Sequence, residues 1–126
     1  MGKKQKEENT LKQFDLVIDY EVKFTSDKNV DGTPLDKNLE YAKLTQSYIV
    51  YAVTAHHKEG LNSQFRRLYA VIEQKMENSI TDKSYIVSLT QSELNFIKDA
   101  FASDKTKFMP QLAKYIIKLE DALALV

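Results

Sequence analysis

The sequence predicts an α+β fold that is mostly helical, in the order strand, helix, helix, strand, helix, helix. Residues 14–24 alternate between apolar and polar side chains, the pattern of a half-buried strand. Residues 33–58 and 61–80 carry apolar side chains at helical spacing instead. With only three Gly and two Pro in 126 residues, most of the chain should be regular structure. We expect a small two-stranded sheet packed with about four helices around a long central helix.

The first expected strand runs from Phe14 to Phe24. Its apolar side chains all point to one face, and most of the intervening residues are charged. The apolar set is Phe14, Leu16, Ile18, Tyr20, Val22 and Phe24. Residues 26–32 have the composition of a turn, so the strand should end before them.

The long helix expected over residues 33–58 has an N-terminal signal, with Thr33 as N-cap, Pro34 in the first position and Asp36 returning to the cap. Gly60 should end it. Its apolar residues form two stripes on opposite sides. One stripe is Leu35, Leu39, Ala42, Ile49 and Val53, and the other is Tyr41, Leu44, Tyr48, Tyr51 and Ala55. Such a helix lies between two layers or offers one face to another chain.

The next two elements complete a helical hairpin and the sheet. Asn62 can cap a helix over residues 61–80, antiparallel to the long helix. Residues 84–89 then alternate as a second, shorter strand.

Two further helices close the chain. Thr90 and Glu93 have the spacing of a capping box and open the third helix. Pro110 starts the fourth. Their inward residues should be Leu94, Ile97, Ala100 and Phe101 in the third helix, and Leu112, Ile116, Leu119 and Leu123 in the fourth.

The element order resembles a doubled unit, although no repeat is visible between residues. An eleven-residue strand beside a six-residue partner leaves unpaired backbone groups on its edge. Either a third strand or another chain should therefore complete the sheet.

Length favours one globular domain over residues 13–126, preceded by a flexible charged tail over residues 1–12. The sequence contains no apolar run long enough to span a membrane and no apolar core of a signal peptide near its start. We expect a cytoplasmic protein. The frequent Lys, Asn and Ile residues are associated with low-GC bacteria and their phages, in which case the location would be the host cytoplasm.

Composition excludes several classes of site. Eighteen basic residues balance eighteen acidic ones, so no net charge attracts nucleic acid. Cysteine is absent, which removes disulfides, zinc-thiolate sites and thiol catalysis. Three glycines can hardly build a phosphate-binding loop. We therefore expect no cofactor, no resident metal and no small-molecule substrate.

Asp19, Glu21 and Lys23 share one face of the expected first strand. A carboxylate followed two residues later by lysine resembles half of a magnesium-dependent nuclease site. Alternating charges on the solvent face of an antiparallel strand explain the same residues more simply. No neighbouring strand supplies the further aspartate that a nuclease needs.

Two other groups of titratable residues have simple explanations. His56 and His57 are neighbours on a helix and project about 100° apart, so they cannot converge on one metal ion. At the end of the long helix they would complement its dipole as cations. Glu73 and Glu77 have the i, i+4 spacing of a carboxylate metal pair, but the sequence lacks the Glu-x-x-His that completes such sites.

Two candidate binding surfaces remain. The tyrosine side of the long helix and the apolar face of the first strand suit a protein interface, since tyrosine contributes both a large ring and a hydroxyl. The interface candidates are Tyr41, Tyr48, Tyr51, Phe14, Tyr20 and Phe24. Lys58, Arg66 and Arg67 form a small basic end of the hairpin that could contact an anion or nucleic acid.

We expect a small non-enzymatic protein that acts through protein contacts, as a self-assembling structural component or as a regulatory or accessory factor. The alternative is a nucleic-acid-binding accessory protein that uses the basic end of the hairpin. A third hypothesis is the magnesium-dependent nuclease. No motif is specific enough to name a family.

Overall fold

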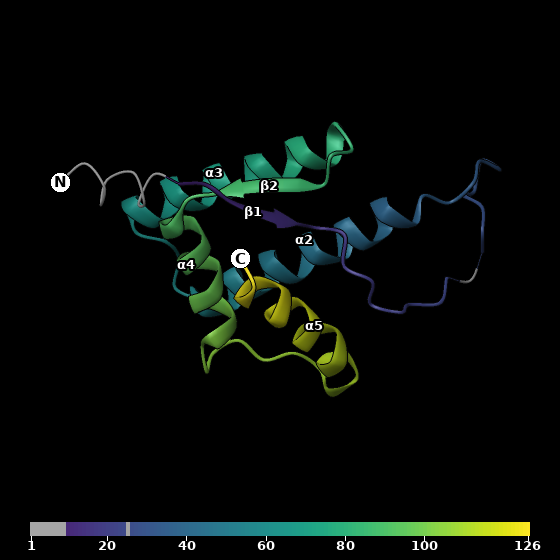
Figure 1. Ribbon diagram of the computed structural model, residues 1–126. Coiled ribbons are helices and arrows are strands. Elements are labelled where there is room, and N and C mark those ends of the chain that lie inside the picture. Colours follow the sequence, from purple (N-terminus) through teal and green to yellow (C-terminus); the bar gives the residue numbers. More distant parts are fainter. Residues whose placement is uncertain (1–9, 25) are drawn as a thin grey trace.

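The computed structural model describes residues 10–24 and 26–126, and it confirms a mostly helical α+β fold (Figure 1). In order, the elements are β1 (Lys12–Asp15), α2 (Lys37–His56), α3 (Ser63–Thr81), β2 (Ile86–Leu89), α4 (Gln91–Ala102), the short 3-10 helix η1 (Pro110–Leu112) and α5 (Ala113–Ala124). This is the predicted order of strands and α-helices. Residues 1–9, most of the predicted charged tail, lie outside the described residues.

The two strands pair with each other, so the sheet forms within one chain. They run antiparallel, with Lys12 opposite Leu89 and Phe14 opposite Val87. Phe14, Val87 and Leu89 are buried because the sheet lays one face on the helices. β2 lies along α3 (Figure 1). It is two residues shorter than the strand predicted over residues 84–89.

The first strand is much shorter than its alternating pattern predicts. β1 ends at Asp15, so only the first two of residues 14–24 are strand. Pairing ends because the partner segment turns away at Tyr85. The Leu16 N–H still donates to the Tyr85 carbonyl oxygen at 2.8 Å, but Tyr85 has a φ of +59° and is not extended. The Tyr85 N–H donates to the Ser79 carbonyl oxygen of α3 instead. The prediction of an eleven-residue strand is therefore wrong.

Residues 16–24 keep the alternation of burial because they stay largely extended against α2. Tyr20 is fully buried, whereas Asp19 and Glu21 are exposed. Local groups supply hydrogen bonds that a neighbouring strand would give: Asp19 Oδ1 accepts from the Glu21 N–H, and Lys118 Nζ donates to the Asp19 carbonyl oxygen. Alternating burial here marks extended backbone without sheet pairing.

The long helix starts three residues later than predicted. Its first residue is Lys37, and its N-cap is Asp36, whose Oδ1 accepts from the N–H of the third helical residue at 3.2 Å. Thr33 belongs to the preceding turn, where its hydroxyl donates to Asp31 Oδ1 at 2.6 Å. The Thr33 hydroxyl oxygen also accepts from Asn29 Nδ2 at 2.9 Å, so it is engaged within the turn, and Asp36 caps the helix instead. Assigning the N-cap to Thr33 was therefore wrong.

The caps of the next two helices are as predicted. Asn62 Oδ1 accepts a backbone N–H from the first turn of α3 at 2.9 Å. Thr90 and Glu93 form the reciprocal capping box of α4. The last helix is divided, because Pro110 opens η1 and α5 begins only at Ala113.

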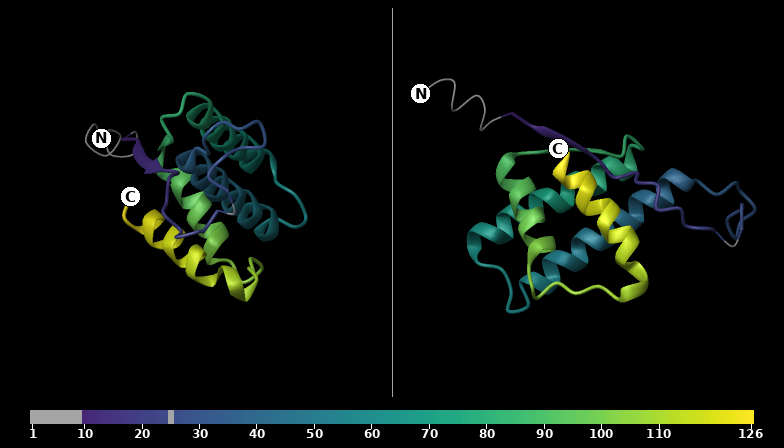
Figure 2. Two further views of the ribbon diagram at one scale, coloured as in Figure 1. Left: turned by 90° about the vertical axis from the view of Figure 1, so that its right-hand side faces the viewer. Right: turned by 60° about the horizontal axis from the view of Figure 1, so that its bottom comes forward.

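α2 is the central helix, with α3 and α4 packed on it and α5 packed on α4 (Figure 2). Its fully buried residues are Ala42, Thr45, Ile49, Ala52 and Val53. Three of these belong to the predicted leucine and isoleucine stripe. The tyrosine stripe is half-buried except at Tyr51, so the chain itself covers most of both faces. Within the described ranges, none of the helices has the length and apolarity needed to cross a membrane.

Candidate functional site

The tyrosine face of α2 is covered mainly by residues 16–24. The Tyr20 ring centroid lies 6.2 Å from that of Tyr41 and 5.7 Å from that of Tyr48, edge-on in the second pair. The Phe24 ring lies 5.6 Å from Tyr41 on the outer side. Burial raises the pKa of Tyr20 to about 12, so its phenol stays neutral. Tyr20 therefore packs against Tyr41 and Tyr48, and Phe24 packs against Tyr41.

Two of the predicted interface residues have no exposed surface to offer. The side chains of Phe14 and Tyr20 lie in the core, with exposed fractions of 2% and 0%. Alternation along the sequence showed correctly that these residues share a buried face. It could not distinguish burial against helices of the same chain from burial against another chain.

Tyr51 is the exception among the predicted tyrosines. Its side chain is 48% exposed, and its ring centroid lies 4.8 Å from that of Phe108. The Tyr51 hydroxyl donates to the Lys107 carbonyl oxygen at 2.7 Å. Met109, which follows Phe108 in the sequence, is 62% exposed. These contacts hold Tyr51 in one orientation at the surface.

A shallow groove with almost wholly apolar walls begins on one side of Tyr51. This aromatic groove has a volume of about 270 Å³ and is lined by Ser47, Tyr48, Tyr51, Phe108, Met109 and Leu112. Burial raises the pKa of Tyr48, and the neighbouring Tyr115 adds to the effect. Phe108 and Met109 were not among the predicted interface residues. Two adjacent large apolar residues between a polar loop and a proline were the available signal.

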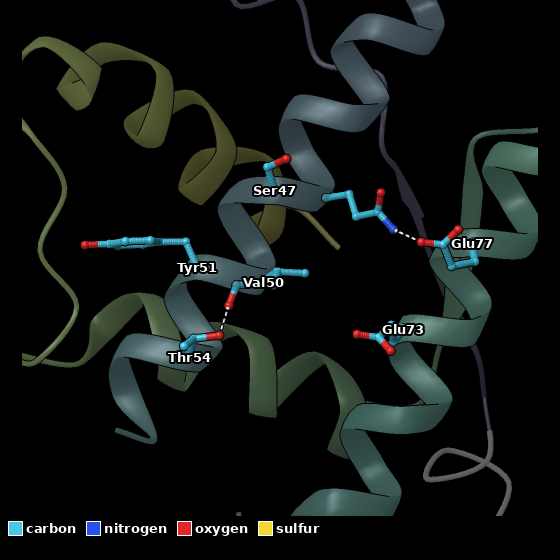
Figure 3. A pocket seen from close by; sticks show the side chains of 7 residues that line it. Ser47, Val50, Tyr51, Thr54, Glu73 and Glu77 are labelled. Carbon is cyan, nitrogen blue, oxygen red and sulfur yellow. Dashed lines mark hydrogen bonds between the residues drawn. The ribbon is translucent and has the colours of Figure 1, made fainter. Parts of the chain in front are cut away.

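A larger groove of about 500 Å³ lies on the other side, between α2 and α3 (Figure 3). This α2–α3 groove is lined by Gln46, Ser47, Val50, Tyr51, Thr54, Glu73 and Glu77. Gln46 Nε2 donates to Glu77 Oε1 at 2.8 Å, and in Figure 3 the Glu73 carboxylate faces the gap. Neither glutamate forms an ion pair with any residue in the described ranges. The wall contributed by α3 is therefore acidic.

The acidic wall also affects its neighbour on α3. Burial raises the pKa of Tyr69 to about 12, and the Glu73 carboxylate adds to this effect.

The two grooves share Ser47 and Tyr51, so they form one continuous surface across α2, which we name the Tyr51 strip. Its aromatic side suits apolar side chains, and its α3 side suits cations. Both grooves are shallow and open, and neither encloses a cavity of the kind that buries a small molecule.

The three residues of the predicted basic end are all exposed near the turn of the hairpin. Lys58 lies in the turn between α2 and α3, and Arg66 and Arg67 lie in the first turns of α3, all three exposed. Arg66 Nη1 donates to the Leu61 carbonyl oxygen at 2.7 Å. This bond steadies the guanidinium and leaves its other N–H groups available.

The two histidines form part of an aromatic stack. The His57 ring lies 4.5 Å from His56 and stacks on Phe96 at 5.3 Å with an interplanar angle of 12°. Burial lowers the pKa of His57, and the nearby His56 and Lys105 lower it further. The neutral form of the His57 ring is therefore favoured. This does not support the prediction that His57 complements the helix dipole as a cation.

The residues of the nuclease hypothesis lie outside any strand. Glu21 has a φ of +59°, and its carboxylate lies 3.6 Å from Lys118 Nζ. The Glu21 N–H and the Tyr41 hydroxyl lower the pKa of Asp19 by hydrogen bonding to its carboxylate. Among residues 10–24 and 26–126, no three or more His, Asp or Glu side chains form a group that could hold a metal ion. The nuclease hypothesis required Asp19, Glu21 and Lys23 to share one face of a strand, and they are not in a strand.

Comparisons with protein-family models, with curated proteins and with solved structures find no match to this chain.

Proposed function

We propose that this protein is non-enzymatic and acts through protein contacts made by the Tyr51 strip. In the first version of this function the chain associates with further copies of itself. In the second version it is a small accessory factor that binds a larger protein through the same strip.

The exposure of Tyr51 is the observation that carries the proposal. The other predicted tyrosines are covered by the chain, whereas Tyr51 and Met109 remain largely exposed beside each other. Large, rigid aromatic side chains and methionine are enriched at the centres of protein interfaces. Both the Phe108 ring and the hydrogen bond to Lys107 limit the motion of Tyr51, so a partner would order little further.

Light scattering coupled to gel filtration tests the self-associating form over a micromolar dilution series. We expect an average mass above that of one chain, falling towards it on dilution. Tyr51→Ser and Met109→Ser should each lower the average mass at a given concentration. Ile117→Ser is the matched control, because Ile117 is 55% exposed on α5 and lines neither groove.

A mass equal to one chain at every concentration would contradict self-association. Association that all three serine variants leave unchanged would instead remove the Tyr51 strip as its surface.

A further inference from the structure

The outward face of α3 carries a charge pattern that is complementary to itself. Exposed residues form two lines along this helix, each with the spacing i, i+4, i+7, i+11. One line is Arg66, Ala70, Glu73 and Glu77, and the other is Arg67, Val71, Gln74 and Asn78. Each line begins with a cation and ends with an acidic or amide side chain. The face therefore has a basic end and a polar, partly acidic end.

We propose that this face binds α3 of a second copy, antiparallel about a twofold axis. In this orientation Arg66 of each copy lies opposite Glu77 of the other, and Ala70 lies opposite Glu73. In a parallel pair Arg66 of one copy would lie opposite Arg66 of the other, and likewise for Arg67. Such like charges oppose association. The proposal rests on the proposed function, because it names the partner and the geometry of the surface that borders the Tyr51 strip.

The middle of the face allows two helices to approach closely. Ala70 and Val71 lie between the charged ends, and Val71 is 46% exposed. In the twofold pair each Ala70 lies opposite Glu73 of the other copy, and the short alanine side chain leaves room for the longer glutamate. The chain as a whole has a formal net charge of zero, so two copies have no net repulsion to overcome.

The acidic end of the face coincides with one wall of the α2–α3 groove. Glu73 and Glu77 line that groove, and neither has an ion-pair partner within the part of the chain that the structure describes. The hydrogen bond from Gln46 holds the Glu77 carboxylate in place (Figure 3). Arg66 donates one bond to Leu61, so its remaining N–H groups can reach a carboxylate of the second copy.

The expected dimer is weak. One helix face buries less than the roughly 800 Å² per partner of a standard interface, so we expect a micromolar or weaker dissociation constant. The ion pairs lie at the surface, so added salt should weaken the dimer further.

Sedimentation equilibrium of the full chain provides the test. Arg66→Glu places two carboxylates opposite each other twice in the dimer, and Glu77→Lys does the same with two cations. We expect each variant alone to dimerise roughly tenfold more weakly than the original chain. An equimolar mixture of the two variants should recover the original affinity. In the mixed dimer the introduced carboxylate at position 66 meets the introduced ammonium group at position 77, and the unchanged Glu77 of one copy meets the unchanged Arg66 of the other. The double variant Arg66→Glu plus Glu77→Lys should also recover it.

Two control variants carry the same changes of charge elsewhere. Lys23→Glu and Asp104→Lys alter exposed residues away from α3 and should leave the dimer unchanged. Circular dichroism and thermal unfolding of every variant check that it is folded, which matters most for Glu77→Lys because it removes the bond from Gln46. Recovery in the mixture gives a second check, since an unfolded variant could not restore the dimer.

Three results would overturn the proposal, and they are distinguishable. Self-association that is lost in Tyr51→Ser but unchanged in the charge variants would leave the proposed function standing and remove the α3 pairing. A strict monomer would remove both. A monomer that binds double-stranded DNA at low salt, with binding lost in Arg66→Glu, would assign the basic end to nucleic acid.

Discussion

The hydroxyl oxygens of Tyr20 and Thr45 lie 2.7 Å apart in the core, where both residues are fully buried. The Thr45 hydroxyl also lies 2.7 Å from the Leu16 carbonyl oxygen and 3.1 Å from that of Tyr41. Its single hydrogen must point to one of these carbonyls, so Tyr20 is the donor in the pair. This chain of hydrogen bonds ties residues 16–24 to α2 in place of a neighbouring strand.

Thr45→Val should destabilise the fold by about 2–4 kcal/mol, because it leaves the Tyr20 hydroxyl and the Leu16 carbonyl without a partner. Tyr20→Phe should cost only about 1 kcal/mol, since Thr45 still donates to a carbonyl. Urea denaturation measures both free energies of unfolding. Thr54→Val is the control on the same helix, because the exposed Thr54 hydroxyl donates to the Val50 carbonyl oxygen of its own helix. Equal effects at positions 45 and 54 would contradict this account.

The difference between β1 and the predicted strand shows what a sequence pattern can establish. Burial alternates over Phe14 to Phe24 as the pattern predicts, although only Phe14 and Asp15 are strand and Glu21 has a positive φ. Whether extended backbone pairs as a strand depends on its partner, and Tyr85 turns the partner away. Capping followed the same rule: the Asn62 side chain caps α3 as predicted, whereas the Thr33 side chain is engaged in a turn.

The candidate site was predictable only in part, for a related reason. Spacing along α2 identified Tyr51, and spacing along α3 placed Glu73 and Glu77 on one face. The exposure of Tyr51 depends on which rings cover its neighbours. Tyr20 and Phe108 lie far from α2 in the sequence and pack on it only in the folded chain.

Glu93 joins two elements through one carboxylate oxygen. Its Oε1 accepts from Lys75 Nζ at 2.7 Å and from the Thr90 N–H at 2.8 Å, and the residue is 4% exposed. Glu93→Ala should cost about 2–3 kcal/mol, because it leaves the Thr90 N–H and the Lys75 cation without partners. Glu93→Gln should cost about half as much, since its amide oxygen still accepts both bonds without the charge.

The exposed pair of Lys118 and Glu21 is the control for Glu93, because its N–O distance is 3.6 Å and Glu21 is largely in solvent. Glu21→Gln should change the free energy of unfolding by less than about 0.5 kcal/mol. High salt should leave the Glu93→Ala effect in place, since a buried pair is screened little. An Ala variant no less stable than the Gln variant would show that neither contact stabilises the fold.

His57 should make stability depend on pH near neutrality. Its folded-state pKa is lowered, mainly by burial, so between that value and about 6.5 the unfolded chain binds more protons at this site. The stabilisation is therefore present above the unfolded pKa and is lost as the pH falls through the folded one. We expect the urea concentration at the unfolding midpoint to decrease as the pH is lowered below about 6.5. His57→Phe, which keeps a ring stacked on Phe96, should reduce that fall, and an unchanged pH profile would rule out His57 as its source.

Lys83 and Gly60 both have a positive φ. Glycine adopts this conformation without strain, whereas lysine does not. Lys83 has a φ of +59° in the turn before β2, where a residue with a Cβ is strained. Gly60 has a φ of +100° after α2, and apart from Gly60 and its two neighbours no described residue has an atom within 4 Å of the position that a Cβ would take. The cost of a side chain at Gly60 is therefore conformational and involves no clash.

Lys83→Gly should stabilise the fold by about 0.5–1 kcal/mol, and Gly60→Ala should destabilise it by about 1 kcal/mol. Lys83→Ala controls for loss of the lysine side chain and should bring no gain, because alanine meets the same strain. Gln74→Gly, at an exposed position in the middle of α3, should cost about 1 kcal/mol and shows what glycine does where φ is negative. Thermal unfolding measures the four variants. If Lys83→Gly were no more stable than Lys83→Ala, the positive φ at position 83 would carry no strain.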